Sequence, residues 1–213
     1  MLTIISCVLS VLAVFLALAG SPEAPPARVF PPQTEADEYT RYELLAPETS
    51  QFRIVYDVTA TTPGASFYFN PIRKGSEASR ESVIERATGE PLKFEVVTGE
   101  EARRTGLPDA DLETRYIRIA LSRPVPSGGQ TRLRIDKTYR DPKSYFREGD
   151  AIVFLRSLGI RRNTIVLPPG FELVFCSVPS QVGTEADGRI RVSFVNPFPD
   201  AAAFTVRARR LAR

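Results

Sequence analysis

Apolar and polar residues alternate in at least five separate runs of this chain, and this pattern constrains the fold more than any other feature of the sequence. The run FRIVYDVTA, for example, places Phe52, Ile54 and Tyr56 on one face. Side chains two residues apart in a β-strand point to the same side of the sheet, so such runs predict strands with one buried face. The pattern recurs in RYIRIALS, TRLRIDKTYR, GRIRVSFVN and AFTVRAR.

Turn sequences separate these runs at short intervals, as in Pro126-Ser127-Gly128-Gly129 and Ala186-Asp187-Gly188. Only GEEARRTG, residues Gly99 to Gly106, reads as a helix, and it is long enough for one or two turns. Many short strands with little helix are typical of antiparallel sandwiches. We therefore expect an all-β chain, an antiparallel β-sandwich of about eight to eleven strands. It would occupy residues 39–213 as one domain or as two closely packed β lobes.

The most apolar stretch of the last three quarters of the chain is NTIVLPPGFELVFCSVP. We interpret it as two core strands, Thr164 to Leu167 and Phe171 to Val178, joined by a Pro-Pro-Gly turn. Each run is far too short to cross a bilayer as a helix. Cys176 lies between Phe175 and Ser177 in the second run, where no base or helix N-terminus is near in sequence to generate a thiolate. The prediction is a buried free thiol.

The first twenty residues, MLTIISCVLSVLAVFLALAG, carry no charged side chain and end in an A-x-A pattern at Ala17-Leu18-Ala19. This layout predicts a secretory signal peptide over residues 1–19, with retention as an N-terminal anchor as the alternative. A Pro-rich leader, residues 20–38, would follow. We expect an extracytoplasmic protein, periplasmic or secreted, that touches a membrane only if the N-terminal segment is retained.

The sequence contains no histidine, and only one of its two cysteines lies outside the N-terminal apolar run. This composition excludes Ser-His-Asp and Cys-His catalytic arrangements and the zinc sites that contain histidine. The chain also lacks a phosphate-binding loop, a dinucleotide fingerprint and a nucleophile elbow. We therefore assign no catalytic residue, no cofactor and no metal ligand from the sequence.

Paired carboxylates are the remaining source of catalysis. One loop region brings together five acidic residues: Glu100, Glu101, Asp109, Asp111 and Glu113. Two facing carboxylates could hydrolyse a glycan, and clustered oxygens could hold Ca²⁺. The spacing does not match a calcium-binding EF-hand loop, and acidic loops are usually solvated, so we prefer a solvated loop.

Basic residues are mostly arginine, 24 against four lysines, but the net charge of +3 is too small to predict nucleic-acid binding. Arg132 with Arg134, and Arg207 with Arg209, share strand faces where basic residues keep a sheet soluble. The segment TYRDPKSYFREGD reads as a connecting loop with exposed aromatic residues, and such loops often bind partners. The residues that we predict to contact a partner are Tyr139, Tyr145, Phe146, Arg161 and Arg162.

The segment RYIRIALSRPVPSGGQTRLRIDKTY, residues Arg115 to Tyr139, forms a strand, a P-V-P-x-G-G turn and a return strand. This arrangement resembles part of the N-terminal β-sandwich of M1-type aminopeptidases and, more loosely, the luminal β-sandwich of ribophorin I. The resemblance covers about Tyr42 to Tyr139. The peptidases' H-E-x-x-H zinc helix has no counterpart here, so the resemblance implies the accessory sandwich without the catalytic domain and transfers no functional residue.

These observations predict an exported, non-catalytic β-sandwich module that binds or scaffolds a protein or a cell-envelope component. The alternative is an extracytoplasmic hydrolase that acts on glycans through paired carboxylates. A structure distinguishes the two, because the hydrolase needs two carboxylates that face each other across a cleft, one of them with a raised pKa.

Overall fold

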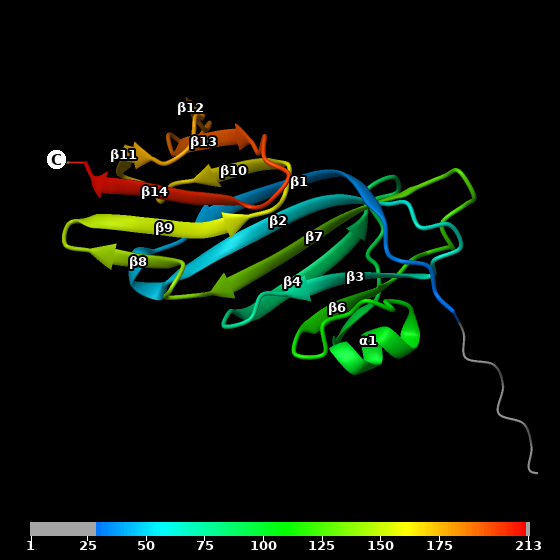
Figure 1. The fold of residues 1–213 in the computed structure, drawn as a ribbon. Coiled ribbons are helices and arrows are strands. Elements are labelled where there is room, and N and C mark those ends of the chain that lie inside the picture. The colour runs from blue at the N-terminus through cyan, green and yellow to red at the C-terminus, as the bar shows by residue number, and fades with distance from the viewer. Residues whose placement is uncertain (1–28, 212–213) are drawn as a thin grey trace, which may run out of the picture.

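The computed structural model describes residues 29–211, so the predicted signal peptide and most of the predicted leader lie outside the described residues. Residues 29–211 form fourteen β-strands, one short α-helix and one 3₁₀ turn (Figure 1). The largest sheet has seven strands, which in spatial order are β12 (Gln181–Thr184), β13 (Ile190–Val195), β10 (Arg162–Val166), β1 (Glu35–Leu44), β2 (Gln51–Ala60), β7 (Thr131–Arg140) and β4 (Glu77–Glu85).

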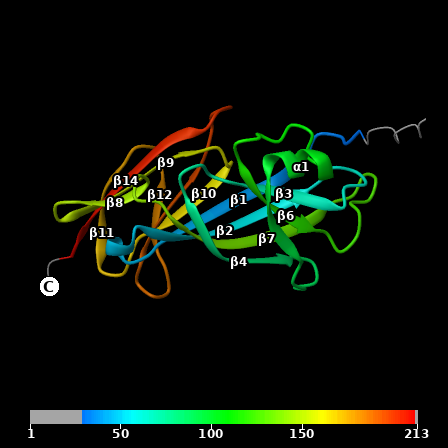
Figure 2. The same ribbon diagram turned by 90° about the horizontal axis from the view of Figure 1, so that it is seen from below.

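Two smaller sheets cover one face of the seven-stranded sheet. One has the order β11 (Phe171–Cys176), β14 (Ala202–Arg210), β9 (Ala151–Leu158) and β8 (Tyr145–Glu148). The other consists of β3 (Phe67–Ile72), β6 (Arg115–Ala120) and β5 (Phe94–Thr98), and α1 (Gly99–Thr105) follows β5. Both views place the four-stranded sheet toward one end of the long strands and the three-stranded sheet with α1 toward the other (Figures 1 and 2). The antiparallel β-sandwich predicted from the alternating runs is confirmed.

One hydrophobic core runs between the layers. Phe52 of β2 and Phe154 of β9 make an edge-to-face contact with ring centroids 5.3 Å apart, and Phe194 of β13 stacks on Phe204 of β14 at 4.8 Å. Ile117 of β6 belongs to the same buried cluster. This cluster extends beneath both smaller sheets, and a second, smaller buried cluster lies beside α1 and the three-stranded sheet: Phe69, Val97, Ala102, Ala110 and Tyr116. Within this range no helix is long and apolar enough to cross a bilayer.

Three details differ from the sequence-based expectations. There are fourteen strands among the described residues where eight to eleven were expected, because short strands such as β8 and β12 show no clear alternation. The pair β1–β10 is parallel and joins the first and last parts of the seven-stranded sheet. The end of the predicted leader is already folded, since β1 begins at Glu35, and the Gln33 side chain hydrogen-bonds both backbone groups of Phe69.

The apolar stretch after Asn163 forms two strands as predicted, β10 and β11, but they belong to opposite sheets. The expectation that both are core strands was wrong for β11, where Val174 and Phe175 are exposed. Gly170 has φ = +75° in the turn that carries the chain across, a conformation that favours glycine. Cys176 is a free cysteine, as predicted, but it is half-buried where full burial was expected. Its Sγ lies 3.3 Å from the carbonyl oxygen of Val178.

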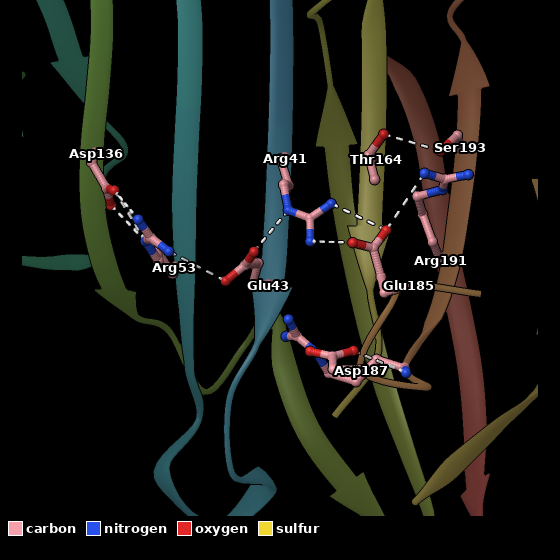
Figure 3. Close-up of polar contacts among 10 residues, drawn as sticks. Arg41, Glu43, Arg53, Asp136, Thr164, Glu185, Asp187, Arg191 and Ser193 are labelled. Carbon is pink, nitrogen blue, oxygen red and sulfur yellow. Dashed lines mark hydrogen bonds and ion pairs between the residues drawn. The ribbon is translucent and has the colours of Figure 1, made fainter. Parts of the chain in front are cut away.

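The outer face of the seven-stranded sheet carries a row of alternating charges (Figure 3). Arg41 of β1 contacts Glu43 at 2.7 Å and Glu185 at 3.0 Å. Glu43 also pairs with Arg53 at 3.5 Å, and Arg53 in turn pairs with Asp136 of β7. These arginines are thus engaged in ion pairs within the sheet.

Candidate functional site

A cavity of about 570 Å³ lies where the two smaller sheets separate above the seven-stranded sheet. Its floor includes Tyr42, Ile54 and Lys137, which are register neighbours across β1, β2 and β7. One wall comes from β3 and the other from the end of β9. We call this space the inter-sheet cavity. Five of the seven tyrosines of the chain line it: Tyr42, Tyr56, Tyr68, Tyr116 and Tyr139.

Lys137 is a buried cation on the cavity floor, with only 4% of its surface exposed. Its Nζ donates a hydrogen bond of 2.5 Å to Asn70 Oδ1 and lies 4.9 Å from the centre of the Tyr139 ring. No carboxylate among the described side chains forms an ion pair with it. Burial, assisted by the nearby charge of Arg156, lowers the pKa of Lys137 to about 7.

Arg156 is the second buried cation, and it comes from β9 on the opposite layer. Its guanidinium carbon lies 5.2 to 5.8 Å from the centres of the Phe52, Tyr139 and Tyr42 rings. The Nη1 atom contacts Asp141 Oδ2 at 3.3 Å. The Nε atom is buried and has no hydrogen-bond partner among the described residues. Burial lowers the pKa of Arg156, although an arginine still carries its charge at neutral pH.

Asp141 is the counter-charge of Arg156, but other donors already occupy its carboxylate. It accepts hydrogen bonds from Ser144 Oγ at 2.7 Å, from Ser76 Oγ at 3.0 Å and from two backbone N–H groups. Burial raises the pKa of Asp141, but these hydrogen bonds outweigh burial and the pKa lies below its usual value. One buried carboxylate, already held by hydrogen bonds from its own turn, thus pairs with one of the two buried cations, which leaves this end of the cavity positive.

The opposite end of the cavity is acidic. Glu35 lines it and accepts a hydrogen bond from the Tyr68 hydroxyl. Glu38 lies beside Glu35, and burial, together with the hydrogen bond and the charge of Glu35, raises the pKa of Glu38 to about 7. Burial also raises the pKa of Tyr42, Tyr68 and Tyr139, so these hydroxyls stay protonated at neutral pH and can donate hydrogen bonds.

The predicted partner-binding residues do not lie together. Tyr139 and Tyr145 are buried in β7 and β8, so the expectation of an exposed aromatic loop was wrong; only the four residues between these strands form the connection. Tyr139 lines the inter-sheet cavity, whereas the Tyr145 hydroxyl donates to the Leu45 carbonyl at 2.8 Å. Phe146 is half-buried in β8. A role of these aromatic residues in partner binding stays a prediction.

Arg161 and Arg162 are exposed, as a partner-binding role requires. They line a shallow depression together with Glu35 and Glu38, and Arg162 Nε donates to the Glu38 carbonyl at 3.3 Å. Their contact with a partner also stays a prediction.

The acidic loop residues do not converge on one point. Glu101 pairs with Arg118 at 3.3 Å, and Asp111 pairs with Lys74 at 3.0 Å. The hydrogen bond from Lys74 holds the pKa of Asp111 below its usual value, the opposite of what a general acid needs. Among residues 29–211, no group of three or more His, Cys, Asp or Glu side chains could hold a metal ion.

Sequence reasoning missed Lys137 and Arg156, although a signal for both was present. Lys137 occupies the same strand face as Ile135 and Tyr139, and Arg156 occupies the same face as Phe154 and Leu158. A cation at an apolar position of an alternating strand indicates a buried charge.

Comparisons with known proteins give a likeness in structure alone. No protein-family model matches the sequence, and no curated protein matches it. The chain is similar to the M1 zinc metallopeptidase of Deinococcus radiodurans, with 11% identity and a TM-score of 0.51 over 81% of this chain and 41% of the peptidase. A mutant of that peptidase gives 12% identity and a TM-score of 0.50 over the same shares. An aminopeptidase N family protein of Idiomarina loihiensis gives 10% identity and a TM-score of 0.49, over 81% of this chain and 29% of that protein.

The resemblance to M1 aminopeptidases is therefore confirmed at the level of the fold. The chain spans 41% of the length of the Deinococcus peptidase, which is compatible with a non-catalytic module. A likeness of 11% identity shows the arrangement of the sheets and carries no activity with it.

Proposed function

We propose that this chain is an exported, non-catalytic β-sandwich module that binds a component of the cell envelope, and that the inter-sheet cavity is its binding site. The cavity is the observation that carries the proposal. Its volume of about 570 Å³ lies within the usual range of small-molecule sites, roughly 300–1,000 Å³. Its lining has the composition typical of such sites, with aromatic rings and a few polar groups that converge on one point.

Export rests on the uncharged N-terminal segment with its A-x-A end. The non-catalytic assignment rests on the arrangement of the acidic groups: those of the acidic loop do not converge, and those beside the cavity lie too close together. A glycosidase needs two carboxyl groups at least about 5 Å apart with a sugar between them. Glu38 and Glu35 are hydrogen-bonded to each other, so no sugar fits between them in this arrangement.

A glycan hydrolase remains the second candidate, because Glu38 has the raised pKa that a general acid requires. In that case Glu38, beside the acidic end of the cavity, would be the general acid in place of the acidic loop, and it would have to separate from Glu35 before the two carboxyl groups could flank a sugar. Turnover on a glycan panel that Glu38→Gln abolishes would establish this second candidate.

Native mass spectrometry of protein purified from the envelope of its own host tests the binding proposal. We expect a co-purified small molecule, released on denaturation, and a second form without it. The variant Ser157→Trp places a large ring at an exposed residue that lines the cavity and should reduce the bound fraction. Equal occupancy of the wild type and Ser157→Trp would place the ligand elsewhere, and a protein that never retains or binds a small molecule would contradict the proposal.

A further inference from the structure

At the cationic end of the inter-sheet cavity, Asp141 is the one carboxylate among the described residues that forms an ion pair with either buried cation, and it pairs with Arg156 alone. Lys137 Nζ makes a hydrogen bond only to the neutral Asn70 amide, and Arg156 Nε has no partner among the described residues. Burying a cation costs several kcal/mol unless an anion or several hydrogen bonds compensate. Lys137 forms no ion pair among the described residues, and the buried Arg156 Nε has no hydrogen-bond partner there, so an anion that binds in the cavity can recover part of this cost.

We propose that the inter-sheet cavity binds a small organic acid, with its carboxylate against Lys137 and Arg156 and its apolar body among the tyrosine rings. This inference rests on the proposed function of the same cavity and names the class of its ligand.

The geometry around the two cations supports this assignment. Lys137 and Arg156 come from opposite layers, β7 and β9, and both approach the Tyr139 ring, at 4.9 Å and 5.7 Å. Both also line the cavity, and the charge of Arg156 helps to lower the pKa of Lys137, so the two cations lie near each other. An ammonium and a guanidinium edge offer the charge-assisted hydrogen bonds that a carboxylate prefers. The tyrosine rings supply the apolar surface on which a ring or chain of the acid would pack.

Binding should depend on pH through Lys137. The charges that act on it are Arg156 of β9 and Glu81 of β4. Arg73, Glu35 and Asp109 also line the cavity, and Glu38 lies beside Glu35. With a pKa of about 7, Lys137 is partly neutral in the free protein at neutral pH. A bound carboxylate favours the protonated amine, so binding takes up a proton and weakens as the pH rises above about 7.

Isothermal titration calorimetry with three probes of one shape tests the inference: 2-naphthoate, 2-naphthamide and 2-naphthylmethylammonium. We expect the carboxylate to bind at least about tenfold more tightly than the amide near pH 7, the factor that one charge-assisted hydrogen bond supplies. Its affinity should fall by up to about tenfold per pH unit above pH 7, whereas that of the amide should not change.

Lys137→Met should reduce the affinity for 2-naphthoate by at least about tenfold, abolish its pH dependence and leave 2-naphthamide within about twofold of wild type. The control Lys93→Met removes an exposed charge and should behave as wild type. If the amide or the ammonium binds as well as the carboxylate, or if the pH dependence survives in Lys137→Met, the inference is wrong while the binding module stands. If no probe binds in the cavity, the proposed function fails as well.

Discussion

At the scale of the residue, two cations, Lys137 and Arg156, occupy positions on the buried faces of β7 and β9 where the alternating pattern otherwise has apolar side chains. Lys137 and Arg156 are 4% and 6% exposed, comparable to their neighbours in the core. Lysine and arginine are almost never fully buried without a partner. Arg156 has Asp141 at 3.3 Å, whereas Lys137 has a neutral amide as its acceptor, so Lys137 is the more costly of the two.

Lys137 should make the stability of the protein depend on pH. Its pKa is about 7 in the folded protein and 10.5 when unperturbed, so between these values the unfolded chain binds more protons than the folded chain. The free energy of unfolding should therefore rise with pH in this window, by up to about 1.4 kcal/mol per unit. Glu38 acts in the window between about pH 4.5 and pH 7, because burial raises its pKa from 4.5 to about 7. Its contribution to the free energy of unfolding is present at low pH and is lost as the pH rises through about 7.

Urea unfolding of wild type and Lys137→Met at about pH 7.5 and pH 9.5 measures this effect. Wild type should gain about 2 kcal/mol between the two conditions, and Lys137→Met should gain much less. Near neutral pH the variant should also be the more stable protein, because methionine fills the same space without a buried charge. If the free energy of unfolding changes equally with pH in the two proteins, Lys137 does not have a lowered pKa in the folded state.

At the scale of the element, ion pairs occur in two environments with different consequences. The outer face of the seven-stranded sheet carries the row that contains Arg41, Glu43 and Arg53, all within reach of solvent (Figure 3). The turn between β7 and β8 contains Asp141, which holds Arg156 in the core and accepts two backbone N–H groups of its own turn. Exposed pairs contribute little, whereas breaking a buried pair leaves an uncompensated charge.

The variants Asp141→Asn and Glu43→Gln compare the two environments with the same loss of one charge. Asp141→Asn should reduce the free energy of unfolding by about 3 kcal/mol or more, because Arg156 keeps its charge in the core. Glu43→Gln should cost about 1 kcal/mol or less, and the cost should shrink in high salt. Equal costs in urea unfolding at low salt would contradict the difference in burial.

Strand faces were the part of the fold that could be predicted from sequence. The run at Thr131–Arg140 shows its alternation openly, and so does Gln51–Ala60, whereas β8 and β12 have four residues each and owe their conformation to the strands that they pair with. The parallel pair β1–β10 joins residues more than a hundred positions apart, which no local pattern records.

The candidate site could likewise be predicted only in part from the sequence. The burial of Lys137 and Arg156 can be read from the alternation of β7 and β9, but their meeting in one cavity depends on how two sheets are stacked. Alternation gives the face of a strand and says nothing about which strand of the other layer lies above it. The same limit explains why Tyr139 was taken for an exposed loop residue when it lies in the cavity wall.

At the scale of the whole molecule, one hydrophobic cluster reaches all three sheets, and the inter-sheet cavity is lined by most of the tyrosines and by both buried cations described above. On the surface, many arginines form ion pairs within the sheets, such as Arg134 with Asp57 and Arg209 with Glu172. The proposal of an anionic ligand therefore rests on the two buried cations of the inter-sheet cavity, Lys137 and Arg156.

A crystal structure of the protein soaked with 6-bromo-2-naphthoate tests the central claim most directly, because the anomalous signal of bromine locates the ring. We expect the bromine peak among the tyrosine rings of the inter-sheet cavity, with the carboxylate within hydrogen-bonding distance of Lys137 Nζ and Arg156 Nε. Bromine peaks confined to the outer face of the seven-stranded sheet, or a carboxylate turned toward the solvent, would contradict the account.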